Sequence, residues 1–316
     1  MLNRSERVLV AGAGGFVGGH LVRYLAAEGF TDIRAADIKP VDQWLQVQPE
    51  AECAQFDLRA RAAAREAVAG CECVVNLTAG TGGTGLRSPR ATTGIPSADV
   101  TATLLEAVVQ AGVARFLQAS SAAACPADLA GERLALRYQA DHGLTVRIAR
   151  YHEVYGPHCE WAGGRERAPA ALSRKVAEAI LAGADEIEIW GDGSQTRALL
   201  HVDDCVRGTL LILEGEFADP CNLGGAEPVS VNQLADFIEE IAGVRLKRRF
   251  HLSAPGGVHG CAGDGARMPQ VPGWEPSVTL PAGLAGTYRW VAGQVSARTL
   301  TGRRGSPGTA GISSAP

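Results

Sequence analysis

The sequence lacks the features of a membrane-spanning, secreted or nucleic-acid-binding protein. No apolar run reaches the about 18 residues that a membrane span needs, and the first residues, MLNRSERVLVAGAGG, lack the layout of a signal peptide. The formal net charge is −4, so the chain offers no general positive field to nucleic acid or to an anionic membrane. We therefore expect a cytoplasmic protein with neither nucleic acid nor membrane as a partner.

Cysteine pairs with metal-binding or redox spacing are also missing. None of the eight cysteines forms a C-x-x-C pair, and we expect reduced thiols in the core or on the surface. Cys71 and Cys73 would point to opposite faces of a sheet if their segment were extended. What the sequence does contain is 46% apolar and 20% charged residues over 316 positions, without an internal repeat. This is enough for one large domain, or for a large and a small one that share an interface.

In the first half of the chain, short apolar runs alternate with segments of helical spacing. The expected strands are Val8–Ala11, Ile33–Ile38, Cys73–Ala79, Arg115–Ser121 and Thr145–Arg150. The expected helices are Phe16–Glu28, Arg59–Ala69, Val100–Ala111 and Asp128–His142. This alternation predicts an α/β fold with a parallel, doubly wound sheet.

Beyond residue 157 the pattern loosens. Helices are expected at Pro169–Leu181, Asp203–Leu213 and Val231–Ile241, with a strand at Glu186–Trp190. We predict that residues 1–156 form the sheet domain and that residues 157–295 form a smaller C-terminal cap over the carboxyl ends of the strands. Residues 296–316 are rich in Gly, Ser, Thr and Ala without apolar periodicity, which predicts a disordered tail.

Three glycines separate the first expected strand from the first expected helix, in the pattern Gly12-x-x-Gly15-x-x-Gly18. Gly12 permits a tight turn, Gly15 lets the backbone approach a pyrophosphate, and Gly18 allows the helix to pack closely. The helix that begins with Phe16 and Val17 directs free N–H groups and a positive dipole end toward the phosphates. This strand–loop–helix unit predicts a Rossmann-type dinucleotide-binding domain.

Acidic residues follow the second strand and a further expected strand. Asp37 is placed to accept hydrogen bonds from the adenosine ribose and to repel a 2′-phosphate, which favours NAD over NADP. Lys39 nearby weakens that preference. Asp57 is either a contact of the adenine amino group or the N-cap of the next helix, and both interpretations stay open.

Several motifs together resemble one enzyme family. The glycine loop, Asp37, Asp57-Leu58, Asn76-Leu77-Thr78-Ala79 and Ser120-Ser121 resemble the extended short-chain dehydrogenase/reductases, the NAD-dependent epimerase/dehydratase group. Within that group, further segments resemble the GDP-mannose 3,5-epimerases: Gly82–Gly85, Arg150–Pro157, Gly163–Ala170 and Trp190–Arg197. The resemblance implies bound NAD beside Leu58, Leu77 and Ala79, and a homodimer. It also implies a GDP-hexose that is transiently oxidised at C4 and epimerised at C3 and C5.

The resemblance assigns residues to the substrate as well. They are Gly83, Ser121, Glu153, Glu166, Arg167, Ala168, Lys175, Gln195, Thr196 and Arg197. Of these, Ser121 is expected to hold a hexose hydroxyl, and Lys175 and Arg197 to meet the diphosphate or the base. The alternative for Lys175 and Arg197 is a solvated surface charge.

The expected reacting centre departs from the family pattern. Only residues 122–131 separate Ser121 from the helical segment Glu132–His142, where the family has a long loop followed by Tyr-x-x-x-Lys. That pair, which supplies the base for the oxidation, is missing here. Tyr138-x-x-x-His142 has the spacing of a substitute; the alternative is a packed aromatic ring beside an exposed histidine.

Other family residues are replaced. The family's catalytic cysteine falls on Ala123, which leaves Cys125 as the candidate acid/base, and its catalytic lysine falls on Arg167, which does not titrate near neutral pH. A substrate-positioning asparagine becomes Glu153, and an arginine near the phosphates becomes Cys261. The catalytic candidates are therefore Ser121, Cys125 and Arg167. Two hypotheses stay open: an NAD-dependent GDP-sugar epimerase of reduced activity, and a non-catalytic protein that binds NAD and a sugar nucleotide.

Overall fold

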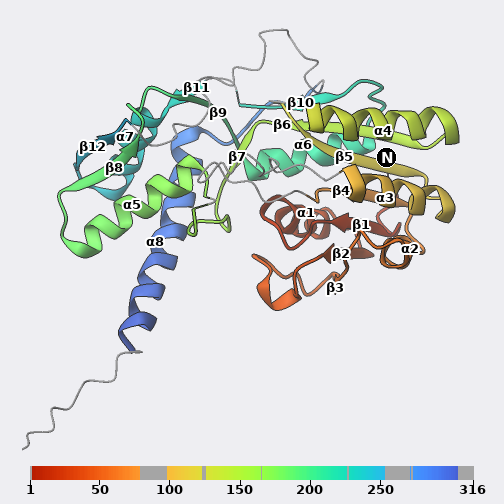
Figure 1. Cartoon of the computed structure of the whole chain (residues 1–316), viewed down its shortest axis with the longest axis horizontal. Coiled ribbons are helices and arrows are strands. Elements are labelled where there is room, and N and C mark those ends of the chain that lie inside the picture. The colour runs from red at the N-terminus through yellow and green to blue at the C-terminus, as the bar shows by residue number, and fades with distance from the viewer. Residues whose placement is uncertain are drawn as a thin grey trace, which may run out of the picture.

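The structure, a computed structural model, describes residues 2–78, 98–122, 126–164, 166–225, 228–252, 271 and 273–304. In this part of the chain, seven parallel strands form one sheet in the order β10-β6-β5-β4-β1-β2-β3 (Figure 1). The strands are β1 (Val8–Ala11), β2 (Ile33–Asp37), β3 (Glu52–Gln55), β4 (Cys73–Asn76), β5 (Arg115–Ser121), β6 (Thr145–Tyr151) and β10 (Cys221–Leu223). The direction of winding reverses between β1 and β4, so a ligand crevice is expected at the carboxyl ends of these two strands.

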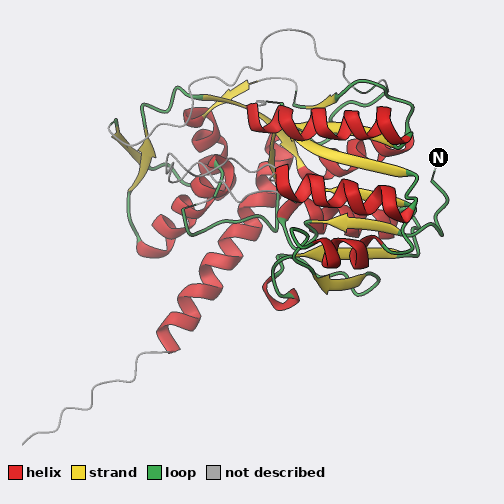
Figure 2. Cartoon of the chain, turned by 45° about the vertical axis from the view of Figure 1, so that its right-hand side comes forward, coloured by secondary structure: helices red, strands yellow, loops and turns green. Residues whose placement is uncertain are grey.

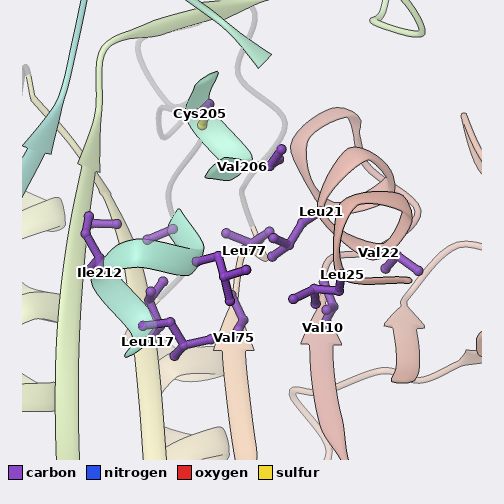
Figure 3. Packing of buried hydrophobic residues seen from close by; sticks show 14 of the residues in the cluster. Val10, Leu21, Val22, Leu25, Val75, Leu77, Leu117, Cys205, Val206 and Ile212 are labelled. Atoms are coloured by element: carbon purple, nitrogen blue, oxygen red, sulfur yellow. The ribbon is translucent and has the colours of Figure 1, made fainter. Parts of the chain in front are cut away.

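Helices cover both faces of this sheet (Figure 2). One face carries α1 (Phe16–Ala27) and α6 (Val202–Glu214); the other carries α2 (Arg61–Val68), α3 (Ala98–Ala111) and α4 (Pro126–His142). Successive residues of a strand enter opposite cores: Phe116 lies in the α2–α4 core and Leu117 in the α1/α6 core. Figure 3 shows the α1/α6 core, where Leu21 and Ile212 pack with strand residues.

A smaller part of the chain packs beside the sheet (Figure 1). Its strands are β7 (Glu153–Tyr155), β9 (Thr196–His201) and β11 (Pro228–Ser230) in one sheet, and β8 (Glu186–Trp190) and β12 (Lys247–His251) in another. Its helices are α5 (Ala168–Ala182), α7 (Val231–Ala242) and α8 (Leu280–Arg304). It has a buried core of its own, which includes Val176, Ile189 and Leu234. A short 3-10 helix, η1 (Val41–Gln43), lies between β2 and β3.

The predicted fold class is confirmed, with corrections to the boundaries. β4 ends at Asn76 rather than at residue 79, and α2 begins at Arg61 rather than at Arg59. α6 and β10 fall within the range predicted for the cap, yet they belong to the large sheet: β10 pairs with β6 and α6 packs against α1. The chain therefore enters the cap after β6 and returns to the sheet domain before its C-terminal part.

The predicted tail begins too early. Residues 296–304 continue α8, since Val291 and Val295 are buried beside Ala177 and the Arg298 guanidinium lies 6.0 Å from the centre of the Trp161 ring. Residues 305–316 lie outside the described residues. No helix in the described part of the chain is long and apolar enough to cross a membrane. The six cysteines described there are free thiols, and Cys71 and Cys73 enter opposite cores as predicted.

Candidate functional site

The glycine loop runs from the end of β1 to the beginning of α1 and passes very close to neighbouring backbone. Gly12 has a left-handed φ of 88°, and a Cβ there would lie 2.7 Å from the carbonyl carbon and oxygen of Leu77. A Cβ on Gly18 would lie 2.1 Å from the Gly12 carbonyl oxygen. Only glycine fits at both positions, which confirms the tight turn and the close helix packing expected from the sequence.

Gly15 is less crowded than Gly12 and Gly18. It is the N-cap of α1 and makes no side-chain capping hydrogen bond. The nearest atom to a Cβ placed on it would be the Gly12 carbonyl oxygen, at 3.2 Å. The first N–H groups of a helix, here those of Phe16 and Val17, have no acceptor within the helix and favour an anion. The loop therefore fits a pyrophosphate.

The segment after β2 contacts the glycine loop through Lys39 and Trp44, which the sequence pattern did not predict. The Lys39 ammonium donates to the Gly14 carbonyl oxygen at 2.5 Å, and the Trp44 indole N–H donates to the Lys39 carbonyl at 2.9 Å. The Trp44 ring covers Gly14, where a Cβ would lie 2.7 Å from ring carbon Cδ1. Lys39 thus binds the glycine loop. In the sequence, the single Trp44 within a polar stretch was the one signal that this segment packs against the loop.

Asp37 is the last residue of β2, and Asp57 follows the end of β3 by two residues, as the sequence predicts. Asp37 is buried and its carboxylate accepts the backbone N–H of Lys39 at 3.0 Å. Asp57 is bound by the Arg59 guanidinium at 2.8 and 2.7 Å, and this hydrogen bonding lowers the pKa of the exposed carboxyl. The N-cap of α2 is Ala60, without a side-chain bond, so the N-cap interpretation of Asp57 is wrong. Leu58 is buried in the core beside it.

A buried polar network lies under the carboxyl ends of β4 and β5. The Asn76 amide donates to Gln118 Oε1 at 3.0 Å and to Thr101 Oγ1 at 3.4 Å, while Thr78 donates to Asn76 Oδ1 at 2.6 Å. These bonds fix the strand ends beside Leu77, which is itself buried. Ser121, the expected hydroxyl-binding residue, is half-buried at the end of β5.

The structure rejects Tyr138-x-x-x-His142 as a substitute for the missing pair. Tyr138 packs against the α2–α4 core near the end of α4, and burial raises its pKa, the opposite of what a base needs. α4 runs antiparallel to the strands, so its C-terminal end is remote from their carboxyl ends. None of the five tyrosines in the sequence is followed by lysine four residues later.

Instead, the α4 face holds a buried ion pair that the sequence did not suggest. The Arg150 guanidinium of β6 donates to Glu132 Oε1 of α4 at 2.7 Å, with a second contact to Oε2. This pairing raises the pKa of Arg150. Because Ser120, Arg150 and Asn222 occupy one lateral row of β5, β6 and β10, their side chains share this face.

The residues expected at the start of α5 have different roles. Arg167 is the N-cap residue and is exposed, and Ala168 is the first residue of the helix. Glu166 accepts the backbone N–H of Gly164 and the Arg174 guanidinium, both at 2.7 Å. Burial favours a raised pKa for Glu166, but these hydrogen bonds hold it below its usual value.

Lys175 is not a solvated charge. Its ammonium donates to the Glu188 carbonyl of β8 at 2.7 Å and lies 5.5 Å from the centre of the Trp190 ring. Burial lowers its pKa. Gln195 lies in the segment between β8 and β9. Its Nε2 donates to the Trp190 carbonyl at 3.3 Å, while its Oε1 is buried without a partner among the described residues. Lys175 and Gln195 therefore both bind backbone carbonyls of β8.

Arg197 and Glu153 face each other on adjacent strands, β9 and β7. Arg197 Nε lies 3.3 Å from Glu153 Oε2, and each side chain is 15% exposed. Thr196 is exposed and begins β9. The structure thus brings together two residues that the resemblance assigned to the substrate separately, one cationic and one anionic.

The remaining candidates lie outside the described residues. They are Ala79, Gly83, Ala123, Cys125 and Cys261. Among the residues that are described, no group of three or more His, Cys, Asp and Glu side chains is arranged to hold a metal ion.

Comparison with known proteins shows the family to which the chain belongs. A family model described as the NAD dependent epimerase/dehydratase family matches residues 8–130 and 126–224. The chain is 34% identical to GDP-mannose 3,5-epimerase 1 of Oryza sativa subsp. japonica, over 94% of this chain and 84% of that protein. The chain belongs to the NAD-dependent epimerase/dehydratase family. Its cofactor is therefore NAD, which the glycine loop and the first turn of α1 fit.

A second sequence relative and a solved structure support the same family and fold. GDP-mannose 3,5-epimerase of Arabidopsis thaliana is 32% identical over 94% of this chain and 85% of its own length. Among solved structures, UDP-glucose 4-epimerase from Thermotoga maritima with UDP-glucose has a TM-score of 0.76 at 24% identity, covering 93% of this chain and 99% of that one. This likeness confirms the Rossmann-type fold of the family.

Proposed function

We propose that this chain is an NAD-dependent epimerase of a GDP-linked hexose, acting at C3 and C5 after transient oxidation at C4, at a reduced rate. The observation that carries the proposal is the intact glycine loop, in which Gly12 and Gly18 pack too closely for any side chain and Gly15 is the N-cap of α1. It is supported by the similarity to GDP-mannose 3,5-epimerases over 94% of the chain. We place the protein in the cytoplasm as a homodimer.

Each proposed role follows from the chemistry of the side chain. When bound, NAD supplies the acceptor and the donor of hydride. Asp37, at the end of β2, holds the ribose hydroxyls, and Asp57 the adenine amino group. Ser121 donates to or accepts from a hexose hydroxyl. Arg167 holds negative charge without exchanging protons, which leaves the proton transfers at the hexose carbons to Cys125.

The reduced rate follows from the missing acid/base groups. The Tyr-x-x-x-Lys pair, the family's cysteine and its lysine are absent together from this sequence. Each acid/base group contributes about 10²–10⁴-fold to a rate, although such contributions do not add independently. We therefore expect turnover orders of magnitude below that of an enzyme that keeps all of them.

The absence of any Tyr-x-x-x-Lys pair favours one second candidate function. Without a base for the oxidation, the same fold can serve as a non-catalytic protein that binds NAD and a sugar nucleotide. The residues that bind ligands in both proposals are the same, so binding measurements alone do not separate them.

Isotope exchange separates the two functions. NAD-loaded protein is incubated with GDP-mannose in D2O, and deuterium at C3 and C5 is followed by NMR. An epimerase incorporates deuterium, and a Gly15→Glu variant, whose side chain fills the pyrophosphate position, does not. If prolonged incubation of the NAD-loaded protein yields no deuterium at either carbon, the epimerase proposal is rejected in favour of the binding protein.

A further inference from the structure

Glu153 and Arg197 form an ion pair inside the region assigned to the substrate. β7 and β9 are parallel neighbours with Glu153 opposite Leu199, which places Arg197 two residues earlier on the same face of the sheet. The 3.3 Å separation between Arg197 Nε and Glu153 Oε2, at 15% exposure each, gives an attraction stronger than that of a fully solvated pair.

A buried acceptor without a hydrogen-bond partner among the described residues lies two residues before Arg197 in the chain. Gln195 precedes Arg197 by two residues and is 3% exposed. Its Oε1 atom has no hydrogen-bond partner among the described residues, while its Nε2 atom is used by the Trp190 carbonyl. Buried acceptors cost free energy when they stay unpaired, so a donor on a ligand would satisfy this oxygen.

A diphosphate that binds Arg197 competes with the Glu153 carboxylate, which already pairs with the guanidinium. The carboxylate neutralises the guanidinium and repels a second anion at the same place. To bind the Nε edge of Arg197 through two parallel hydrogen bonds, a phosphate must displace Glu153. The displaced carboxylate then needs donors of its own, and a sugar nucleotide carries hexose hydroxyls next to the diphosphate, which the bare nucleoside diphosphate lacks.

We propose that Glu153 is a specificity-determining residue that competes with the ligand diphosphate for Arg197 and selects ligands whose sugar hydroxyls can satisfy its displaced carboxylate. The inference rests on the proposed function, because it takes Arg197 as a diphosphate contact. It deepens that function: the site favours a nucleotide-linked hexose over the bare nucleoside diphosphate. Binding exchanges one ion pair for two ligand contacts.

Calorimetric titration tests the inference without any need for turnover. GDP and GDP-mannose are titrated into the NAD-loaded wild-type protein and into Glu153→Gln, which keeps the shape of the side chain and removes its charge. We expect Glu153→Gln to bind GDP about tenfold more tightly, since the competing carboxylate is gone. Affinity for GDP-mannose rises less, so the preference for the sugar nucleotide falls. Glu153→Asn, shorter and also neutral, serves as a second variant if Glu153→Gln fails to fold.

Asp185→Asn is the matched control, because it removes a carboxylate from the exposed Lys247 pair. It is expected to leave both affinities unchanged. The inference is overturned, while the proposed function stands, if wild-type protein binds GDP-mannose and Glu153→Gln binds GDP no more tightly than wild type. If neither GDP nor GDP-mannose binds to either protein, the proposed substrate is wrong, and the role of Glu153 is rejected with it.

Discussion

The carbonyl oxygen of Gly12 lies 2.1 Å from the position that a Cβ atom on Gly18 would occupy. No side chain fits there unless the loop and α1 move apart. Gly18→Ala is therefore expected to destabilise the fold by about 1–3 kcal/mol and to weaken NAD binding, because the loop shifts. Gly286→Ala, in α8 with no atom within 4 Å of the added Cβ, is the control and keeps or raises stability. Urea denaturation measures both; equal stabilities would contradict the packing argument.

Asp37 is predicted to set the choice between NAD and NADP. Its buried carboxylate lies at the end of β2 and repels a 2′-phosphate. In Asp37→Asn, the ratio of NADP to NAD affinity is expected to rise about tenfold, since the like-charge repulsion is removed. Asp42→Asn, exposed on the same loop, should leave the ratio unchanged. Competition binding of the two dinucleotides provides the measurement; an unchanged ratio in Asp37→Asn would remove Asp37 from the cofactor site.

The Glu132–Arg150 pair is predicted to stabilise the fold. Its side chains are 4% and 13% exposed, so removing the Glu132 carboxylate deprives a largely buried guanidinium of this anionic partner. Glu132→Gln is expected to lower the free energy of unfolding by about 3–5 kcal/mol. The exposed pair of Arg137 and Asp141 is the control: Asp141→Asn changes it by less than about 0.5 kcal/mol. If both variants lose the same free energy of unfolding, the buried pair stabilises the fold no more than the exposed one.

His20 predicts how stability depends on pH. Its ring is fully buried, bonded to the Pro157 carbonyl at 2.9 Å and to the Arg23 guanidinium at 3.0 Å. Burial lowers its pKa to about 4, with Arg23 and His158 acting in the same direction and the Pro157 bond and Asp203 opposing. Between pH 4 and 6.5 the unfolded chain binds more protons at this position than the folded one. Stability therefore falls with decreasing pH across this window, by about 3 kcal/mol in total.

Replacing the histidine tests this pH dependence. In His20→Gln, the slope of unfolding free energy against pH between 4.5 and 6.5 should be shallower than in wild type. His142→Gln, at the exposed end of α4, should keep the wild-type slope. Denaturant midpoints across that range are the measurement, and a His20→Gln slope equal to that of wild type would assign the proton uptake elsewhere.

The sheet domain was predictable from the sequence because its signals are local. β5 has the bounds expected from its apolar run, and α1 begins at the expected Phe16, since strand and helix periodicities are encoded in neighbouring residues. The tight turn at Gly12 and the close packing at Gly18 were also predictable, because this glycine spacing between a strand and a helix specifies one loop geometry. The later return of α6 and β10 to the large sheet depends on tertiary packing and has no local signal.

Side-chain partners were much less predictable. The sequence predicts either a diphosphate contact or a solvated charge for Lys175. In the structure Lys175 binds the Glu188 carbonyl, because β8 packs beside α5. Glu153 and Arg197 are 44 residues apart, and their contact exists only after β7 and β9 pair. α8 was not predicted, although its signal is local. Leu284, Val291 and Val295 have helical spacing, but the small residues around them obscured the pattern.

Titration of nucleotide-free protein with NAD tests the central claim, that the Gly12–Gly18 loop holds the cofactor, most directly. The wild-type protein is predicted to bind one NAD per chain. Gly15→Glu is predicted to keep the far-UV circular dichroism of wild type, because Gly15 has a φ of −88° that other residues adopt and the Gly12 carbonyl oxygen alone lies near its Cβ position among the described residues. It is predicted to lose NAD binding, because its carboxylate occupies the pyrophosphate position. A folded Gly15→Glu variant that binds NAD as tightly as wild type would contradict the account.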